Sequence, residues 1–111
     1  MSKWIGKEVF DCAGFVRKCI AQAGIAMVPG ATSQWNKTNW MQKGEIATLP
    51  KDKVCCLYRY RDGRMQHTGI YLGDGTEIDA RGSASGVVGP VAVDKYPWTH
   101  WGIPAGLYDN N

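Results

Sequence analysis

The first strong pattern along the chain is a helical repeat of apolar positions near its start. These positions recur at intervals of three and four residues, at Cys12, Phe15, Val16, Cys19, Ile20 and Ala23. Such spacing places the side chains on one face of an α-helix. Asp11 stands directly before the series as a favourable N-cap, and Gly24 is a favourable residue to end it. The pattern predicts an amphipathic helix that begins at Cys12 and ends near Ala23.

The pattern then changes from helix to loop and from loop to strands. Glycine, proline, serine and asparagine interrupt residues 25–50, which predicts mostly loop with a short helix around Ser33–Met41. From Lys53 onward, β-favouring segments alternate with turn residues such as Asp62-Gly63. The predicted strands are KVCCLYRY, HTGIYLG, TEIDA, GVVGPVAV and WTHWGIP. Gly89-Pro90 interrupts the fourth of these, which predicts a bulged or edge strand.

This order of elements predicts an α+β fold. A helix, a loop region and roughly five antiparallel strands are typical of helices packed on one side of a meander sheet. The chain has 111 residues, a length that suits one domain rather than two. We therefore expect residues 1–111 to form a single domain with the N-terminal helix packed on the sheet.

Charge and hydropathy exclude several classes of function. The chain has 13 Lys and Arg against 10 Asp and Glu, which gives a mild net charge of +3. We therefore expect no nucleic-acid partner, although the charge suits an anionic surface such as a bacterial wall. No apolar run approaches the ~20 residues of a membrane span, so we expect none. The opening MSKWIGKEVFDCAGF lacks the apolar core of a signal peptide, so export would need another route or a parent protein.

The four cysteines do not follow a metal-binding or disulfide pattern. Their positions fit no template of paired CxxC zinc ligands, and we expect neither a metal nor a cofactor. Cys55 and Cys56 are adjacent, so on a strand they point to opposite faces and cannot meet one partner. We expect Cys19, Cys55 and Cys56 to be buried free thiols.

Cys12 stands apart because of its place in the predicted helix. As the first residue after the Asp11 cap, its thiol lies at the positive end of the helix dipole, which favours the thiolate. The unpaired backbone amides of the same turn can receive negative charge that develops on a substrate carbonyl oxygen. One position therefore supplies a candidate nucleophile and part of an oxyanion site, whereas Cys19 lies two turns further on.

A nucleophilic cysteine needs a base, and His67 is the candidate. If Gly73-Asp74-Gly75 forms a three-residue hairpin loop, residue 70 pairs with 78 and residue 69 with 79. Asp79 then becomes the diagonal neighbour of His67 on the same face of the sheet. A two-residue loop would place Asp79 on the opposite face. The hypothesis of a Cys12–His67–Asp79 triad therefore requires the odd loop, and Asp79 would fix the ring tautomer and stabilise the imidazolium.

Several segments, in order along the chain, resemble the NlpC-type cell-wall cysteine peptidases. Residues 11–25, DCAGFVRKCIAQAGI, are similar to the nucleophile helix of that family, whose usual form is DCSGFV. Residues 67–80, HTGIYLGDGTEIDA, resemble its HVGIYIGDG segment. ATSQWN resembles the polar stretch after the first helix, and LPKDKVCCLY the family's PGDLVFF strand. ARGSASGVV with WTHWG resembles a subset found in phage and prophage wall enzymes.

The resemblance implies a fold, an activity and a set of site residues. It implies a compact papain-like α+β domain, working as a monomer outside the cell or at its wall. Members typically hydrolyse amide bonds in peptidoglycan stem peptides, usually between γ-D-glutamate and the following diamino acid. By resemblance, Cys12 is the nucleophile, His67 the base, and Asp79 the third catalytic residue, where the family often has His. Asp11 corresponds to a residue that can hold the free amine of the substrate.

The sequence departs from the family pattern at two places. Ala13 replaces the usual Ser after the nucleophile, and no Tyr precedes Cys12, where the family has one in a YxxGG-like segment. We therefore expect a domain that is short at its N-terminus.

Three classes of function stay open at this level. The first is a peptidoglycan endopeptidase in which Cys12 forms a thioester that water hydrolyses, or a related Cys–His–Asp amidase or acyltransferase. The second is a cell-wall-binding module of the same fold without turnover. The third is a metal protein with Cys12, His67, Asp79 or His100 as ligands, although we expect His100 to be a packing residue.

Overall fold

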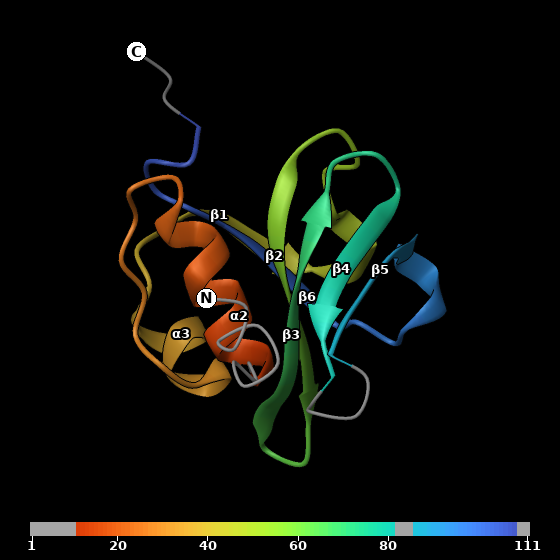
Figure 1. Cartoon of the computed structure of the whole chain (residues 1–111), viewed down its shortest axis with the longest axis horizontal. Coiled ribbons are helices and arrows are strands. Elements are labelled where there is room, and N and C mark those ends of the chain that lie inside the picture. Colours follow the sequence, from red (N-terminus) through yellow and green to blue (C-terminus); the bar gives the residue numbers. More distant parts are fainter. Residues whose placement is uncertain (1–10, 82–85, 109–111) are drawn as a thin grey trace, which may run out of the picture.

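A computed structural model of the chain describes residues 11–81 and 86–108. Two α-helices, α2 (Cys12–Ala21) and α3 (Ala31–Lys37), are followed by strands and two short 3₁₀ helices, η1 (Ile46–Thr48) and η2 (Val93–Lys95). The strands are β1 (Trp40–Glu45), β2 (Val54–Arg61), β3 (Arg64–Leu72), β4 (Thr76–Ala80), β5 (Val87–Ala92) and β6 (His100–Pro104). The predicted α+β class is thus confirmed (Figure 1). The expected shortening at the N-terminus concerns residues outside the described ranges.

The strands of the described residues form one six-stranded sheet in the order β1-β6-β2-β3-β4-β5. The part from β2 to β5 is the predicted meander, and Asp62 and Gly63 form the β2–β3 turn with the positive φ angles that such a turn requires. β5 is an edge strand with an irregular register opposite β4, as Gly89-Pro90 indicated. The last strand differs from a simple meander, because β6 returns across the sheet to pair with β2.

The prediction of roughly five strands was wrong because it missed β1. The sequence predicted loop with a helix around Ser33–Met41, whereas α3 ends at Lys37 and a strand begins at Trp40. β1 has no alternation of apolar and polar residues and contains Gly44, so its sequence does not favour a strand. Its structure comes from antiparallel pairing with β6, about sixty residues away in the chain.

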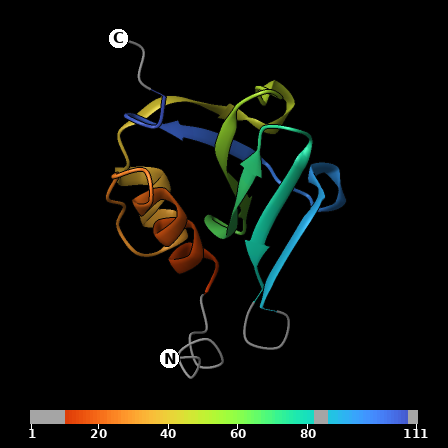
Figure 2. The ribbon, with the colours of Figure 1, turned by 45° about the horizontal axis from the view of Figure 1, so that its top comes forward.

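Each face of the sheet carries its own hydrophobic core. The helices lie on one face, where Val16 and Ile20 of α2 pack with Cys56 and Tyr58 of the sheet (Figures 1 and 2). The other face is covered by the segments around η1 and η2 and by the end of the described chain. Its buried residues are Leu49, Cys55, Leu57, Tyr71, Trp98, Trp101 and Ile103. Cys55 and Cys56 therefore point to opposite faces, as predicted.

No helix among the described residues has the length and apolar character to cross a membrane.

Candidate active site

The candidate nucleophile lies at the first residue of α2. Asp11 caps the helix as predicted, because its side-chain Oδ1 accepts a hydrogen bond of 2.6 Å from the backbone N–H of Gly14. The helix ends at Ala21, two residues before the predicted position, and Gly24 adopts a left-handed φ of 80°. The first-turn amides of Cys12 and Ala13 have no earlier helical carbonyl to bond. They are therefore candidate donors to an oxyanion.

A buried glutamine fixes this first turn against the sheet. Gln34 of α3 has no exposed surface, and its Nε2 donates to the Ala13 carbonyl at 3.0 Å. Its Oε1 accepts a hydrogen bond of 3.0 Å from the hydroxyl of Tyr58 on β2, which is also fully buried. The residue after Cys12 is therefore tied through one side chain to the centre of the sheet. The sequence showed Gln34 only as part of a polar stretch.

The structure brings His67 and Asp79 together through the predicted register. Ile70 pairs with Ile78, so the loop between β3 and β4 has three residues. The Nε2 atom of His67 lies 2.6 Å from Oδ2 of Asp79. Because the carboxylate can only accept, Nε2 carries the proton and Nδ1 is the ring nitrogen left for Cys12. At Gly69, a Cβ atom would come within 2.9 Å of the Asp79 Cβ, so glycine leaves the room that this pairing needs.

The pKa of His67 reflects this pairing. Burial of the ring by itself lowers the pKa, but hydrogen bonds with Asp79 and with the Cys12 thiol outweigh burial. Together with the electrostatic interactions with the same two residues, they raise the pKa of His67 from 6.5 to about 9. An imidazolium at neutral pH is the form that pairs with a thiolate at Cys12.

Arg81, which was not among the site residues predicted from the sequence, is a second hydrogen-bond donor to Asp79, beside His67. Its Nε donates to Oδ2 at 2.7 Å, the same oxygen that receives His67, and its Nη2 lies 3.7 Å from the buried carboxyl of Glu77. Burial alone would raise the pKa of Asp79, but the hydrogen bonds from His67 and Arg81 hold it well below its ordinary value. Glu77 and Asp79 lie on β4 and Arg81 follows the strand directly, and this every-second-residue spacing could have indicated their proximity. Burial, followed by the neighbouring Asp79, raises the pKa of Glu77.

Two aromatic rings hold the imidazole in place. The indole of Trp98 stacks on His67 with the ring centroids 5.4 Å apart and the planes 10° from parallel. The ring of Tyr96 lies 5.1 Å from His67, and the guanidinium groups of Arg59 and Arg81 lie over it at 5.5 and 5.1 Å. The connection between β5 and β6 therefore forms one wall of the site.

An open cleft of about 390 Å³ lies beside Cys12 and His67. Its lining residues are Asp11, Cys12, His67, Ala80, Arg81 and Tyr96. Three of the four predicted site residues thus face one cleft, while Asp79 is fully buried behind His67. The arrangement offers a thiol, a base oriented by a carboxylate, and first-turn amides, a set suited to acyl transfer.

The remaining candidates lie elsewhere. The four cysteines are free thiols; Cys55 and Cys56 are buried, and Cys19 is only partly buried. His100 packs on the helix side of the sheet, 5.3 Å from the ring of Trp35, beside a separate cavity of about 330 Å³. Among residues 11–81 and 86–108, no three His, Cys, Asp or Glu side chains form a group that could hold a metal ion.

Comparison with known proteins gives matches over most of the chain. It is 30% identical to the Probable endopeptidase p60 of Listeria grayi over 97 residues, which is 87% of this chain and 17% of that protein. Over 83 residues it is 35% identical to the Peptidoglycan endopeptidase RipB of Mycobacterium tuberculosis strain H37Rv, which is 74% of this chain and 32% of that protein. The chain thus spans between about a sixth and a third of the length of these relatives. Residues 3–103 match the NlpC/P60 family, and the chain belongs to that family.

Proposed function

We propose that this chain is a peptidoglycan hydrolase that cleaves an amide bond in the stem peptides by cysteine catalysis. The observation that carries the proposal is that Cys12 and His67 line one cleft, with Asp79 hydrogen-bonded to His67, within a chain of the NlpC/P60 family. The names of its relatives support the substrate, since RipB is named a peptidoglycan endopeptidase. The bond we propose joins γ-D-glutamate to the following diamino acid.

The proposed reaction proceeds through a thioester. The Cys12 thiolate attacks the scissile carbonyl carbon, and the first-turn amides of α2 stabilise the oxyanion. The C–N bond then breaks as the imidazolium of His67 gives its Nδ1 proton to the leaving amine. A water molecule, deprotonated by the now neutral ring, attacks the thioester and releases the acid. Asp79 keeps Nε2 protonated and stabilises the imidazolium in both stages.

The surroundings of the nucleophile support a role in substrate binding for Asp11. Asp11 is exposed at the same cleft, and its Oδ1 accepts a hydrogen bond from the backbone N–H of Gly14. We propose that it also binds a free amine of the stem peptide. We further propose that residues 1–111 act as one papain-like catalytic domain of the phage-type subset, as a monomer, outside the cell or at its wall.

A defined peptide tests the assignment of the nucleophile. The wild-type chain, Cys12→Ala and Cys19→Ala are incubated with a soluble L-alanyl-γ-D-glutamyl-diamino acid peptide, and products are identified by mass spectrometry. Cys19 belongs to the same helix and is the matched control, because it carries the same chemical group outside the cleft. We expect cleavage by the wild type and by Cys19→Ala, and none by Cys12→Ala.

Other outcomes would contradict the proposal in distinct ways. Cleavage that survives in Cys12→Ala would remove the nucleophile assignment. Binding of the peptide without cleavage by any folded variant would point to a wall-binding module. An acyl adduct on an added amine, in place of hydrolysis, would indicate an acyltransferase.

A further inference from the structure

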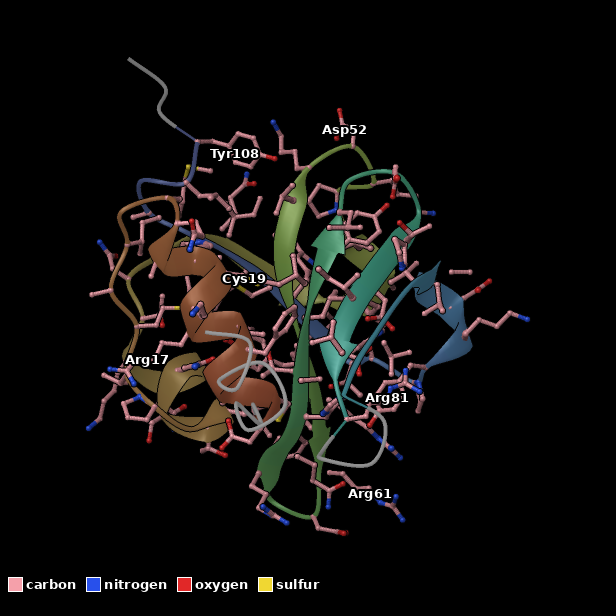
Figure 3. The ribbon with its side chains drawn as sticks, in the orientation of Figure 1. Arg17, Cys19, Asp52, Arg61, Arg81 and Tyr108 are labelled. Atoms are coloured by element: carbon pink, nitrogen blue, oxygen red, sulfur yellow. The ribbon has the colours of Figure 1, made fainter. Side chains whose placement is uncertain are left out.

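Arg81 presents a cation to the cleft in addition to its contact with Asp79. Its side chain is 35% exposed and lines the cleft together with Cys12 and His67. Figure 3 shows it at the end of β4. Cationic and anionic side chains therefore both border the nucleophile, because Asp11 lines the same cleft from the start of α2.

The guanidinium has more donors than its protein partners use. Nε and one Nη2 hydrogen face the Asp79 carboxylate, at 2.7 Å and 3.4 Å, and Nη2 also lies 3.7 Å from Glu77 Oε2. A guanidinium has five N–H donors, and the contacts described for Arg81 within residues 11–81 and 86–108 do not use Nη1, which leaves that side for a further acceptor. The Tyr96 ring lies 5.1 Å below the charge and limits its movement. The second guanidinium on this ring, that of Arg59, has its Nη1 directed at the Tyr96 hydroxyl at 3.4 Å and does not line the cleft.

We propose that Arg81 binds a carboxylate of the stem peptide next to the scissile bond. It thereby selects for peptides in which this group is a free carboxylate rather than an amide. This inference rests on the proposed function. The hydrogens of Nη1 can donate charge-assisted hydrogen bonds to one carboxylate, which adds directionality to the charge. The fixed hold on Asp79 means that the fork is already oriented before substrate arrives, so little entropy is lost on binding.

Arg81 and Cys12 line the same cleft, so a carboxylate close to the reacting carbonyl can reach the guanidinium. Two hydrogen bonds, of 2.7 and 2.6 Å, separate the guanidinium from the imidazole that faces Cys12. A γ-linked glutamate leaves its α-carboxylate free, four bonds or roughly 5 Å from the scissile carbon. A diamino acid with a side-chain carboxylate supplies a second source, on the leaving-group side. Both have the chemistry that Arg81 recognises, and amidation of either one removes it.

Three matched peptides test this proposal and separate the two sources. The first peptide carries both carboxylates, the second has the glutamate α-carboxylate converted to the amide, and the third has the diamino-acid side chain converted to the amide. We expect the wild-type kcat/KM to fall about 10- to 100-fold for one of the two amidated peptides, as for loss of a hydrogen bond to a charged group. In Arg81→Gln this preference should disappear.

Two further arginine variants serve as controls. Arg61→Gln removes the same charge from an exposed residue at the β2–β3 hairpin and should keep the wild-type preference (Figure 3). Arg81→Lys keeps the charge without the planar fork and should keep part of the preference. If Arg81→Gln does not fold, the test still rests on two results. These are the ratio of kcat/KM values that the wild type shows between the unmodified and amidated peptides, and the smaller ratio expected of Arg81→Lys.

The proposal is overturned if the wild type treats all three peptides alike. It is also overturned if Arg81→Gln lowers kcat/KM by the same factor for all three, because Arg81 would then act only through Asp79. Titrating the same peptides into Cys12→Ala reads the preference as a ratio of Kd values. Failure of cleavage by the wild type would thus contradict the proposed function, while the Kd ratios still decide the role of Arg81.

Discussion

Asp79→Asn should disable the site while leaving its shape almost unchanged. The fully buried carboxylate accepts hydrogen bonds from His67 at 2.6 Å and from Arg81 at 2.7 Å. Hydrogen bonds between charged groups contribute about 1.5–3 kcal/mol each. The amide of Asn has the same size, but it removes the negative charge and offers a donor on one side.

The size of the effect follows from the pKa of His67. Its rise from 6.5 to about 9 corresponds to roughly 3 kcal/mol in favour of the imidazolium. Burial opposes this rise, and the hydrogen bond with Asp79 is the largest contribution in its favour. We expect the variant to lose about 2 kcal/mol of this stabilisation, which lowers the equilibrium constant for protonation of His67 by roughly 30-fold. Loss of ring orientation adds to this, so kcat/KM should fall by about 100-fold or more.

Two measurements and one control test this reasoning. Hydrolysis of a stem peptide gives kcat/KM, and an NMR titration of the imidazole gives the pKa of His67, which should move down. Asp52→Asn removes the same charge from an exposed residue at the opposite end of the sheet from Arg81 (Figure 3) and should change neither value. A kcat/KM within about threefold of the wild type, together with an unchanged pKa of His67, would refute the electrostatic account.

Three further outcomes follow from the same geometry. Gln34→Leu removes the donor to the Ala13 carbonyl and should cost about 1–3 kcal/mol in urea unfolding, whereas an unchanged midpoint would deny that Gln34 anchors the helix. Gly69→Ala places a Cβ 2.9 Å from the Asp79 Cβ; we expect about 1–3 kcal/mol of destabilisation and reduced activity, and full activity would show that the strands have room. Because folding raises the pKa of His67 to about 9, its stabilisation is complete below pH 6.5 and is lost as pH rises through 9. The free energy of unfolding should therefore decline across pH 6.5–9 by up to about 3 kcal/mol, and a decline of the same size in His67→Gln would contradict this.

The parts of the fold that depend on local sequence were predictable. The apolar spacing and the Asp11 cap predict α2 and place Cys12 at its first residue. The length of the β3–β4 loop fixes which residues of the two strands face one another, so the His67–Asp79 contact follows from a three-residue turn. In both cases neighbouring residues determine the structure.

The parts that depend on distant segments were not predictable. β1 is a strand because β6 pairs with it, and its own residues do not indicate this. Gln34 contacts Ala13, and Arg81 contacts the ring of Tyr96, across segments that are separate in the sequence. Buried polar side chains of this kind acquire their roles from tertiary packing, so a single sequence shows their presence but not their partners.

The measurement that tests the central claim most directly is digestion of purified, fragmented peptidoglycan by the wild type and by Cys12→Ala, with the products identified by mass spectrometry. The account predicts fragments with a new amino-terminal diamino acid from the wild type and none from the variant. Absence of products from a wild-type chain whose fold is intact by circular dichroism would contradict it. Fragments cut at another bond would contradict the assignment of the γ-D-glutamyl linkage.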